Sequence, residues 1–242
     1  MAHFYLADSL ETTTVGATVL LDGPEGRHAS TVSRVRVGET VAIGNGRGLL
    51  ITGEVQATSK DTVELQVLSV EQVELSYPQL YLVQALAKTD RDERAVEAAT
   101  ELGIDVVIPW AADRSVSKWE GPKVDKGIAR WSAIVREATK QSIRPFIPRV
   151  GPHLKTAQLG AELDGINVLV LDPTGTIPLS QVELDQRSIA IIVGPEGGIT
   201  DAELSRFAES GATIVTLGSN ILRTSTAGPA ALAILNAKLG RC

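Results

Sequence analysis

The chain has 242 residues, of which 43% are hydrophobic and 21% are charged, a balance that predicts a soluble globular protein with a substantial core. No apolar run approaches the roughly 18 residues of a membrane-spanning helix, and the N-terminus lacks the apolar region of a signal peptide. The single cysteine, Cys242, excludes an intramolecular disulfide. His3, His28 and His153 lack metal-ligand spacing. We therefore expect a cytoplasmic protein without a membrane segment or a metal site.

The net charge of −6 is unevenly distributed along the chain. Residues 114–155 hold 10 basic and 3 acidic side chains, a local charge of +7. A smaller basic cluster lies nearer the N-terminus and consists of Arg27, Arg34, Arg36 and Arg47. Local basic patches can bind phosphate even on an acidic protein. A solvated helix face explains the long basic segment equally well.

Residues 1–72 have the pattern of a small β domain. Val63, Leu65 and Val67 alternate with polar residues, as the residues of a half-buried strand do. Further short strands are predicted at 17–21, 40–43 and 49–55, with a hairpin turn at Asn45-Gly46 and a short helix at 27–35. We expect these elements to form a small barrel, followed by a linker near 69–78.

Residues 73–242 alternate between strand and helix patterns. Strands are predicted at 80–86, 105–110, 168–171, 189–193 and 213–217. Helices are predicted after Asp90 as the capping residue, at 123–142, after a capping box of Thr200 and Glu203, and from near Pro229 to Lys238. The apolar runs do not alternate with polar residues, which indicates strands buried on both faces. The order predicts an α/β fold with a parallel sheet and helices on both faces.

Three turns follow strands of this predicted sheet and should meet at its carboxyl edge, where open α/β sheets bind ligands. Their sequences are Asp172-Pro173, then Gly194-Pro195-Glu196-Gly197-Gly198, then Leu217-Gly218 with Ile221-Leu222-Arg223-Thr224-Ser225-Thr226-Ala227 close behind. The Gly-rich turn is neither a P-loop nor a dinucleotide fingerprint. Its glycines let a ligand approach the backbone, although an ordinary strand-to-helix turn explains the segment taken alone.

Taken together, these motifs resemble the SPOUT class of trefoil-knotted methyltransferases and, within it, the RsmE type. The resemblance covers nearly the whole chain. Further matching residues are Arg94, Glu97, Glu101-Leu102-Gly103, Pro109, Arg114-Ser115, Trp131, Glu137-Ala138, Gln141-Ser142, Arg144 and Pro148. The chain departs from the family pattern at Ser225, where Glu is usual, and at Asn220, where Arg is common.

The resemblance implies a PUA-like, RNA-binding β-barrel over 1–72 and a SPOUT methyltransferase domain with a C-terminal trefoil knot over 73–242. It also implies a homodimer in which the knotted loops bind S-adenosylmethionine. The reaction would be methylation of N3 of a specific uridine in 16S rRNA, within the small ribosomal subunit. The cofactor-binding residues carried over are Leu171, Gly194, Glu196, Gly197, Gly198, Leu217, Gly218, Ile221, Leu222 and Thr226.

Arg223 is the candidate catalytic residue, because a cation would favour the uracil anion that forms when N3 loses its proton. An ion pair that holds the loop is the alternative role for Arg223, and capping of the helix near Thr200 is the alternative for Glu196. Arginine is too basic to accept the proton, so no general base is identified. The candidate RNA-binding residues are Arg34, Arg36, Arg114, Arg136, Lys140 and Arg144.

Other functions stay open from the sequence. A SPOUT methyltransferase could act on a tRNA base or a ribose 2′-hydroxyl. A non-catalytic RNA-binding protein could keep the fold without the cofactor, and an unrelated α/β enzyme could use the glycine loop to bind phosphate. The apolar stripe of the last helix, which includes Leu232 and Leu235, fits either a dimer interface or burial within one subunit.

Overall fold

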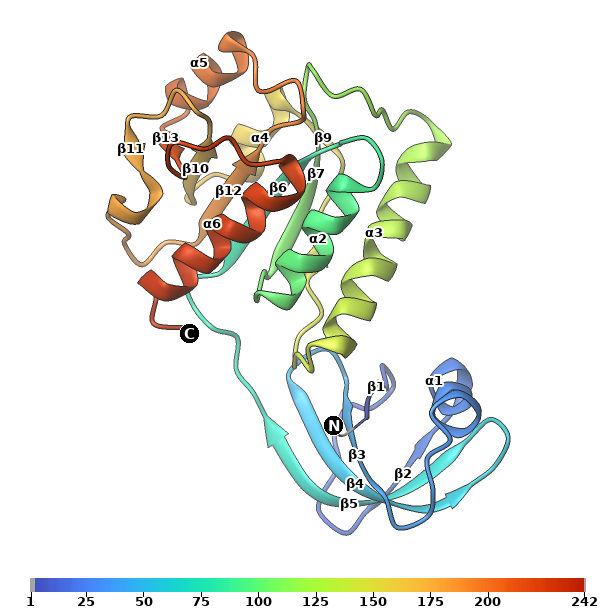
Figure 1. The fold of residues 1–242 in the computed structure, drawn as a ribbon. Helices are drawn as coiled ribbons and strands as arrows, with labels where there is room; N and C mark the ends of the chain where they lie inside the picture. The colour runs from blue at the N-terminus through green and yellow to red at the C-terminus, as the bar shows by residue number, and fades with distance from the viewer. Residues whose placement is uncertain (1–2, 242) are drawn as a thin grey trace. The chain divides into compact units, whose positions relative to one another are not determined.

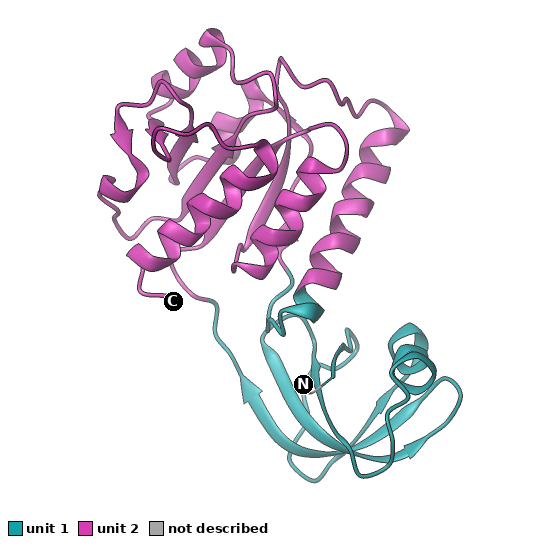
Figure 2. Cartoon of the chain, viewed as in Figure 1, with its two compact units in different colours: residues 1–75, 139–147 teal, residues 76–138, 148–242 magenta. Residues whose placement is uncertain are grey.

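A computed structural model describes residues 3–241 of the chain (Figure 1). The chain divides into two compact units, shown in Figure 2. The first unit holds the residues up to Leu75 together with Thr139–Ile147, and the second holds Ser76–Ala138 and the chain from Pro148 onward. Cys242 lies outside the described residues. Within residues 3–241, no helix is long and apolar enough to cross a membrane.

The first unit is built on a five-stranded sheet with the order β1-β3-β4-β5-β2. Its strands are β1 (Phe4–Leu6), β2 (Thr18–Leu21), β3 (Thr40–Gly44), β4 (Leu49–Thr58) and β5 (Val63–Gln72). The pair β1–β3 is parallel and the other pairs are antiparallel. Val63, Leu65 and Val67 are buried as the alternation predicts.

The helix of the first unit begins before the predicted position. It consists of α1 (Gly23–Arg27), with Pro24 in its first turn, and a π-helical turn, His28–Val32. Proline is favoured in the first turn because its missing N–H has no helical partner there. The predicted span of 27–35 was therefore wrong at both ends.

The segment 139–147 belongs to the first unit, although the predicted boundary at 72 assigned it to the second domain. The amide of Gly48 donates to the carbonyl of Pro145 at 2.9 Å, and the amide of Ile147 donates to the carbonyl of Gly46 at 3.0 Å. Lys140 forms an ion pair with Glu25 at 2.9 Å. These bonds place a segment from the middle of the chain against the N-terminal sheet.

The second unit contains an eight-stranded sheet whose registered pairs are all parallel. The strands are β6 (Leu80–Ala85), β7 (Val106–Ala111), β8 (Arg149–Val150), β9 (Leu154–Lys155), β10 (Asn167–Leu171), β11 (Ile177–Pro178), β12 (Ile189–Val193) and β13 (Thr213–Thr216). Their order is β11-β13-β10-β12-β6-β7-β8, with β9 also paired to β7. The parallel sheet predicted for residues 73–242 is confirmed, and the turns after β10, β12 and β13 leave it at the same edge.

Helices cover both faces of this sheet. The helices are α2 (Arg91–Glu101), α3 (Pro122–Gln141), α4 (Thr156–Glu162), α5 (Asp201–Glu209) and α6 (Thr224–Lys238). Helices α2 and α6 lie side by side (Figure 1), and Asn236 of α6 donates to the carbonyl of Leu102 at 2.6 Å. On the other face, Leu159 of α4 and Phe207 of α5 pack with strand residues in one core.

The predicted helix starts were correct in some cases and wrong in others. The capping box of Thr200 and Glu203 is confirmed. Asp90 precedes α2 as predicted but has a left-handed backbone, with φ of 56°, and its side chain makes no capping hydrogen bond. The last helix begins at Thr224, so Pro229 lies inside it rather than in its first turn.

Candidate functional site

A cavity of about 300 Å³ opens where β10 and β13 end and α6 begins. Five of the predicted cofactor-binding residues line it: Leu171, Leu217, Gly218, Ile221 and Leu222. Asp172, Pro173, Val215, Thr216, Ser219, Asn220 and Ala227 complete the lining. The walls are mainly apolar, as a slot for a flat aromatic ring requires.

Gly218 gives this cavity an open stretch of backbone. Its φ is +126°, a conformation that side chains rarely adopt, and no heavy atom lies within 4 Å of the place a Cβ would occupy. The hydroxyl of Thr216 donates to the carbonyl of Gly218 at 3.0 Å and fixes the turn. A ligand can therefore approach the main chain at this point.

The Gly-rich turn lies beside the cavity rather than in its lining, which does not include Gly194, Glu196, Gly197 or Gly198. A Cβ on Gly194 would lie 2.7 Å from a side-chain atom of Ile199. Gly194 thus contributes to the packing of the turn, and cofactor contact by the glycines of the turn stays a prediction. Thr226, on the first turn of α6, is exposed and also outside the lining.

Glu196 holds the Gly-rich turn against the segment that precedes α2. Its carboxylate accepts from the amide of Lys88 at 3.1 Å and pairs with Arg91 at 3.0 Å. Burial opposes ionisation, but hydrogen bonds from its own amide, from Lys88 and from Arg91 outweigh that effect and lower the pKa of Glu196. The alternative role as a helix cap is wrong, since Thr200 caps α5.

Two of the predicted RNA-binding residues have structural partners instead. Arg114 donates to the carbonyl oxygens of Gly197 at 3.1 Å and Ile199 at 3.5 Å, so its guanidinium supports the Gly-rich turn. The side chain of Lys140 is only 10% exposed and is paired with Glu25. Both cations therefore have protein partners, and phosphate contact by either one stays a prediction.

The other predicted RNA-binding residues are divided between the units. Arg34 and Arg36 are exposed in the first unit, and Arg34 has a left-handed backbone with φ of 54°. Arg144 is half-buried and belongs to the segment 139–147 of the first unit, whereas Arg136 is half-buried on α3 in the second.

Arg223 immediately precedes α6 and is exposed. Its neighbour Leu222 lines the cavity. Its guanidinium forms no hydrogen bond or ion pair with any residue in 3–241. The alternative role, an ion pair that holds the loop, therefore lacks a partner within this part of the chain, and the cation is available to a ligand.

Two buried polar residues near the site were missed by sequence reasoning. The hydroxyl of Thr224 donates to the carbonyl of Gly194 at 2.8 Å and accepts from the amide of Gln84 at 2.8 Å. Both residues are almost completely buried. A signal existed for Gln84, which is a polar residue inside an otherwise apolar strand run.

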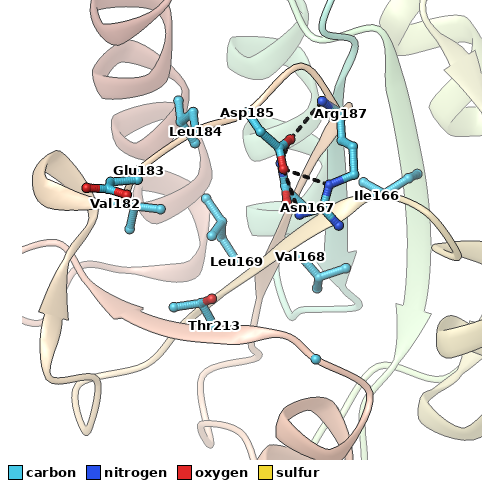
Figure 3. Close-up of a pocket in the computed structure, with 11 residues that line it drawn as sticks. Ile166, Asn167, Val168, Leu169, Val182, Glu183, Leu184, Asp185, Arg187 and Thr213 are labelled. Atoms are coloured by element: carbon cyan, nitrogen blue, oxygen red, sulfur yellow. Dashed lines mark hydrogen bonds and ion pairs between the residues drawn. The ribbon is translucent and has the colours of Figure 1, made fainter.

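A second cavity, of about 400 Å³, lies at the opposite edge of the sheet, where β10 and β13 begin. Figure 3 shows Asp185 facing Arg187 and Asn167 on its wall, and Asp185 accepts from Asn167 at 2.6 Å and from Arg187 at 2.9 Å. Those bonds lower the pKa of Asp185 to about 2. Because Asp185 and Arg187 are paired with each other and the cavity lies at the amino edge of the strands, it is not the candidate site.

No group of three or more His, Cys, Asp or Glu side chains is arranged to hold a metal ion in residues 3–241.

Comparison with protein families defines the class to which this fold and site belong. A family described as RNA methyltransferase domain matches residues 74–236, and one described as RNA methyltransferase PUA domain matches residues 21–68. The class is therefore that of the RNA methyltransferases that carry a PUA domain.

Individual relatives narrow the class. The Ribosomal RNA small subunit methyltransferase E of Mycobacterium bovis is 40% identical over 238 residues, covering 96% of this chain and 90% of that protein. The protein of the same name from Bacillus subtilis is 30% identical, and the alignment covers 98% of this chain and 96% of the Bacillus subtilis protein. This chain belongs to the ribosomal RNA small subunit methyltransferase E family.

Solved structures have the same fold over the full length. The Ribosomal RNA small subunit methyltransferase E of Neisseria gonorrhoeae, bound to S-adenosyl methionine, has a TM-score of 0.87 and 30% identity, with 98% of each chain covered. A methyltransferase from Legionella pneumophila in complex with the cofactor SAM also has a TM-score of 0.87, at 27% identity and with 98% of each chain covered.

Proposed function

We propose that this protein transfers a methyl group from S-adenosylmethionine to N3 of one uridine in 16S rRNA. The observation that carries the proposal is the cavity at the carboxyl ends of β10 and β13 in a chain of this methyltransferase family. Its relatives are named for the small-subunit ribosomal RNA, and two structural neighbours were solved with the cofactor.

The residues of the cavity suit this cofactor. The apolar walls formed by Leu171, Leu217 and Leu222 fit the flat adenine ring. The open backbone at Gly218 offers hydrogen-bonding groups to the edge of that ring. Gly194, Glu196, Gly197, Gly198 and Thr226 remain proposed contacts for the rest of the molecule, in the adjoining turn and the start of α6.

S-adenosylmethionine, when bound, supplies an electrophilic methyl group on its sulfonium sulfur. The protein has to orient the uracil and stabilise the negative charge that its ring acquires as N3 loses a proton. Arg223 is placed for this role, since its exposed guanidinium follows the cavity residue Leu222 and has no partner in residues 3–241. The guanidinium stays charged throughout and cannot accept the proton that leaves N3.

We also propose that the turns after β10, β12 and β13 form a trefoil knot and that the protein is a homodimer. Ile221, on the cavity loop, is 82% exposed, which suits an apolar interface beside the cofactor. Residues 1–72 would form a PUA-like barrel that binds RNA, joined in the first unit by 139–147, and the rest of 73–242 would form the methyltransferase domain. The substrate would be rRNA in the small ribosomal subunit, in the cytoplasm.

Phosphate contacts are proposed for Arg34, Arg36, Arg136 and Arg144. Arg34 and Arg36 are two exposed cations close in sequence, which suits contact with consecutive phosphates. Arg114 and Lys140 would support the fold of the binding surfaces instead, through the Gly-rich turn and Glu25.

The proposal is tested by adding labelled S-adenosylmethionine and the protein to small ribosomal subunits from a strain that lacks this gene. Nucleoside mass spectrometry then identifies the modified residue. New 3-methyluridine at one position is the expected result. Label in a ribose or in tRNA would support another target, which the departures at Ser225 and Asn220 make worth testing. The absence of label in any RNA, with cofactor bound, would contradict the enzymatic proposal.

A further inference from the structure

A third cavity, of about 540 Å³, lies at the carboxyl ends of β7 and β9. It is on the same edge of the sheet as the cofactor cavity, because all registered pairs of the sheet are parallel. Its lining comes from the 111–120 loop, the start of α4 and the start of α5. The proposed methyl transfer makes no use of this space, which is large enough for one nucleotide.

Two aromatic rings form part of its wall. The ring centroids of Trp119 and His153 are 5.6 Å apart, and Trp119 also meets the edge of Trp131 at 5.4 Å. A Cβ at Gly127 of α3 would lie 2.4 Å from the Trp119 indole, so this helix can carry only glycine where the ring rests. The indole is thus held in place at the cavity, as a stacking surface for a base requires.

Two residues of the lining carry buried polar atoms without partners. Ser115 is 5% exposed, lines the cavity, and its hydroxyl has no hydrogen-bond partner within residues 3–241. The Nε2 atom of His153 is also buried without a partner there. Burial and the nearby Lys155 lower the pKa of His153, which keeps its ring neutral. Buried polar groups are normally satisfied, so these two atoms make the wall around the aromatic rings polar as well as apolar.

The charged groups around the cavity are of both signs. Lys118, Lys155 and Arg206 are exposed cations on its wall. The acidic residues there are Asp113, Glu120 and Glu203. The carboxylate of Glu203 already accepts four hydrogen bonds at 2.8–3.0 Å, from the amides of Asp113 and Thr200 and from the hydroxyls of Thr156 and Thr200. Three cations and two further carboxylates, Asp113 and Glu120, thus remain on the wall, and the cations can meet an anionic group.

The Gly-rich turn connects this cavity to the cofactor cavity. One end of the turn is fastened to α6 through Gly194 and Thr224 at 2.8 Å. The other end is fastened to the 111–120 loop through Arg114 and Gly197 at 3.1 Å. A chain of nucleotides that reaches the cofactor cavity along this edge of the sheet would therefore meet the third cavity next.

We propose that the third cavity binds a nucleotide of the substrate RNA that lies close to the target uridine in the strand. Its base would pack against Trp119 and His153, beside the buried Ser115. Its phosphate would lie near Lys118, Lys155 and Arg206. This inference rests on the proposed function, because it adds a specificity site to the same reaction.

The experiment compares full-length variants in the methyl-transfer assay on small ribosomal subunits. His153→Leu and Lys155→Gln are expected to raise the KM for the subunit by about tenfold, the order of one lost stacking or phosphate contact. The kcat and the Kd for S-adenosylmethionine should stay unchanged. Lys126→Gln removes an exposed charge from α3 outside the cavity and is the matched control. Ser115→Ala provides a milder variant if the others fail to fold.

Ultraviolet crosslinking with peptide mass spectrometry supplies a readout that does not need turnover. RNA attached to residues 115–119 or 153–155 supports the inference. Unchanged KM values in folded variants, or crosslinks elsewhere only, would overturn it while leaving the methyltransferase proposal intact. RNA crosslinked at the cavity by a protein that methylates no RNA would support the binding site and contradict the proposed reaction.

Discussion

The hydroxyl of Thr224 donates to the carbonyl oxygen of Gly194 at 2.8 Å, across 30 residues of sequence. The same hydroxyl accepts from the side-chain amide of Gln84 at 2.8 Å. One buried side chain therefore joins the start of α6, the Gly-rich turn and strand β6. This bond fixes the position of the loop that carries Ile221, Leu222 and Arg223 relative to the sheet edge.

Replacement of Thr224 by valine should weaken cofactor binding. Valine keeps the shape but leaves the Gly194 carbonyl and one N–H of the Gln84 amide without their partner, at a cost of about 1–3 kcal/mol. Calorimetric titration with S-adenosylmethionine and thermal unfolding should both show the loss. Thr176→Val, at an exposed threonine, is the control. Equal affinity in the Thr224 variant would show that the turn is held by other contacts.

Gly218→Ala should abolish cofactor binding, because the added methyl group would strain the backbone and enter the cavity. Gly211 offers a matched control, since its φ is +85° and the space around its Cβ position is also open. Gly211 does not line the cofactor cavity. Both variants should lose about 1 kcal/mol of stability. Only Gly218→Ala should lose its affinity for S-adenosylmethionine, as measured by titration. Similar affinities in the two variants would remove Gly218 from the cofactor site.

Arg223→Ala should lower kcat about 100-fold, the usual effect of removing one group that stabilises an anion in the transition state. The Kd for the cofactor should change little, because Arg223 does not line the cavity. Arg223→Lys should restore part of the rate by keeping the positive charge. Single-turnover methylation separates these quantities, and a cofactor affinity that falls in step with the rate would make Arg223 a binding residue.

The sequence predicted the parts of the fold that depend on local pattern. Non-alternating apolar runs such as Ile189–Val193 are buried strands of a parallel sheet. The rule that parallel strands end at one edge correctly brought Leu171, Leu217 and Gly218 to one cavity. The same rule did not reveal that the side chain of Glu196 pairs with Arg91, because that contact depends on where α2 packs.

Tertiary contacts explain the remaining errors. Pro229 predicted the start of the last helix, but the bond between Thr224 and Gly194 anchors an additional turn before it. Pro229 has no backbone N–H, so one helical hydrogen bond is absent where this turn joins the rest of α6. Likewise, no local sequence pattern indicated that 139–147 packs with the first unit. Its contacts, such as the ion pair of Lys140 with Glu25, join residues about 100 positions apart.

The pair of Lys140 and Glu25 should contribute to the stability of the first unit. Both side chains are almost buried, 10% and 12% exposed. Lys140→Met would leave the carboxylate without its cation, at a cost of about 3–5 kcal/mol. Urea denaturation should show this loss and a partial recovery in the double variant with Glu25→Gln. The pair of Arg27 and Asp61 is 65% and 51% exposed, so Arg27→Met should cost less than about 1 kcal/mol. Equal losses of stability in the Lys140→Met and Arg27→Met variants would contradict a stabilising role for the buried pair.

Glu203 should make the second unit sensitive to acid. Burial opposes ionisation of this carboxyl, but hydrogen bonds from Thr200, Asp113 and Thr156 outweigh it and lower its pKa below the ordinary 4.5. A lowered pKa in the folded state stabilises the protein above about pH 4.5, and this contribution disappears as pH falls through the folded value. Glu203→Gln should therefore cost about 1–3 kcal/mol at pH 7, and the difference from the original protein should shrink below pH 4.5. Glu209→Gln, on the same helix but exposed, should change neither the stability at pH 7 nor its dependence on pH. A pH-independent difference would show that the loss comes from packing rather than from the charge.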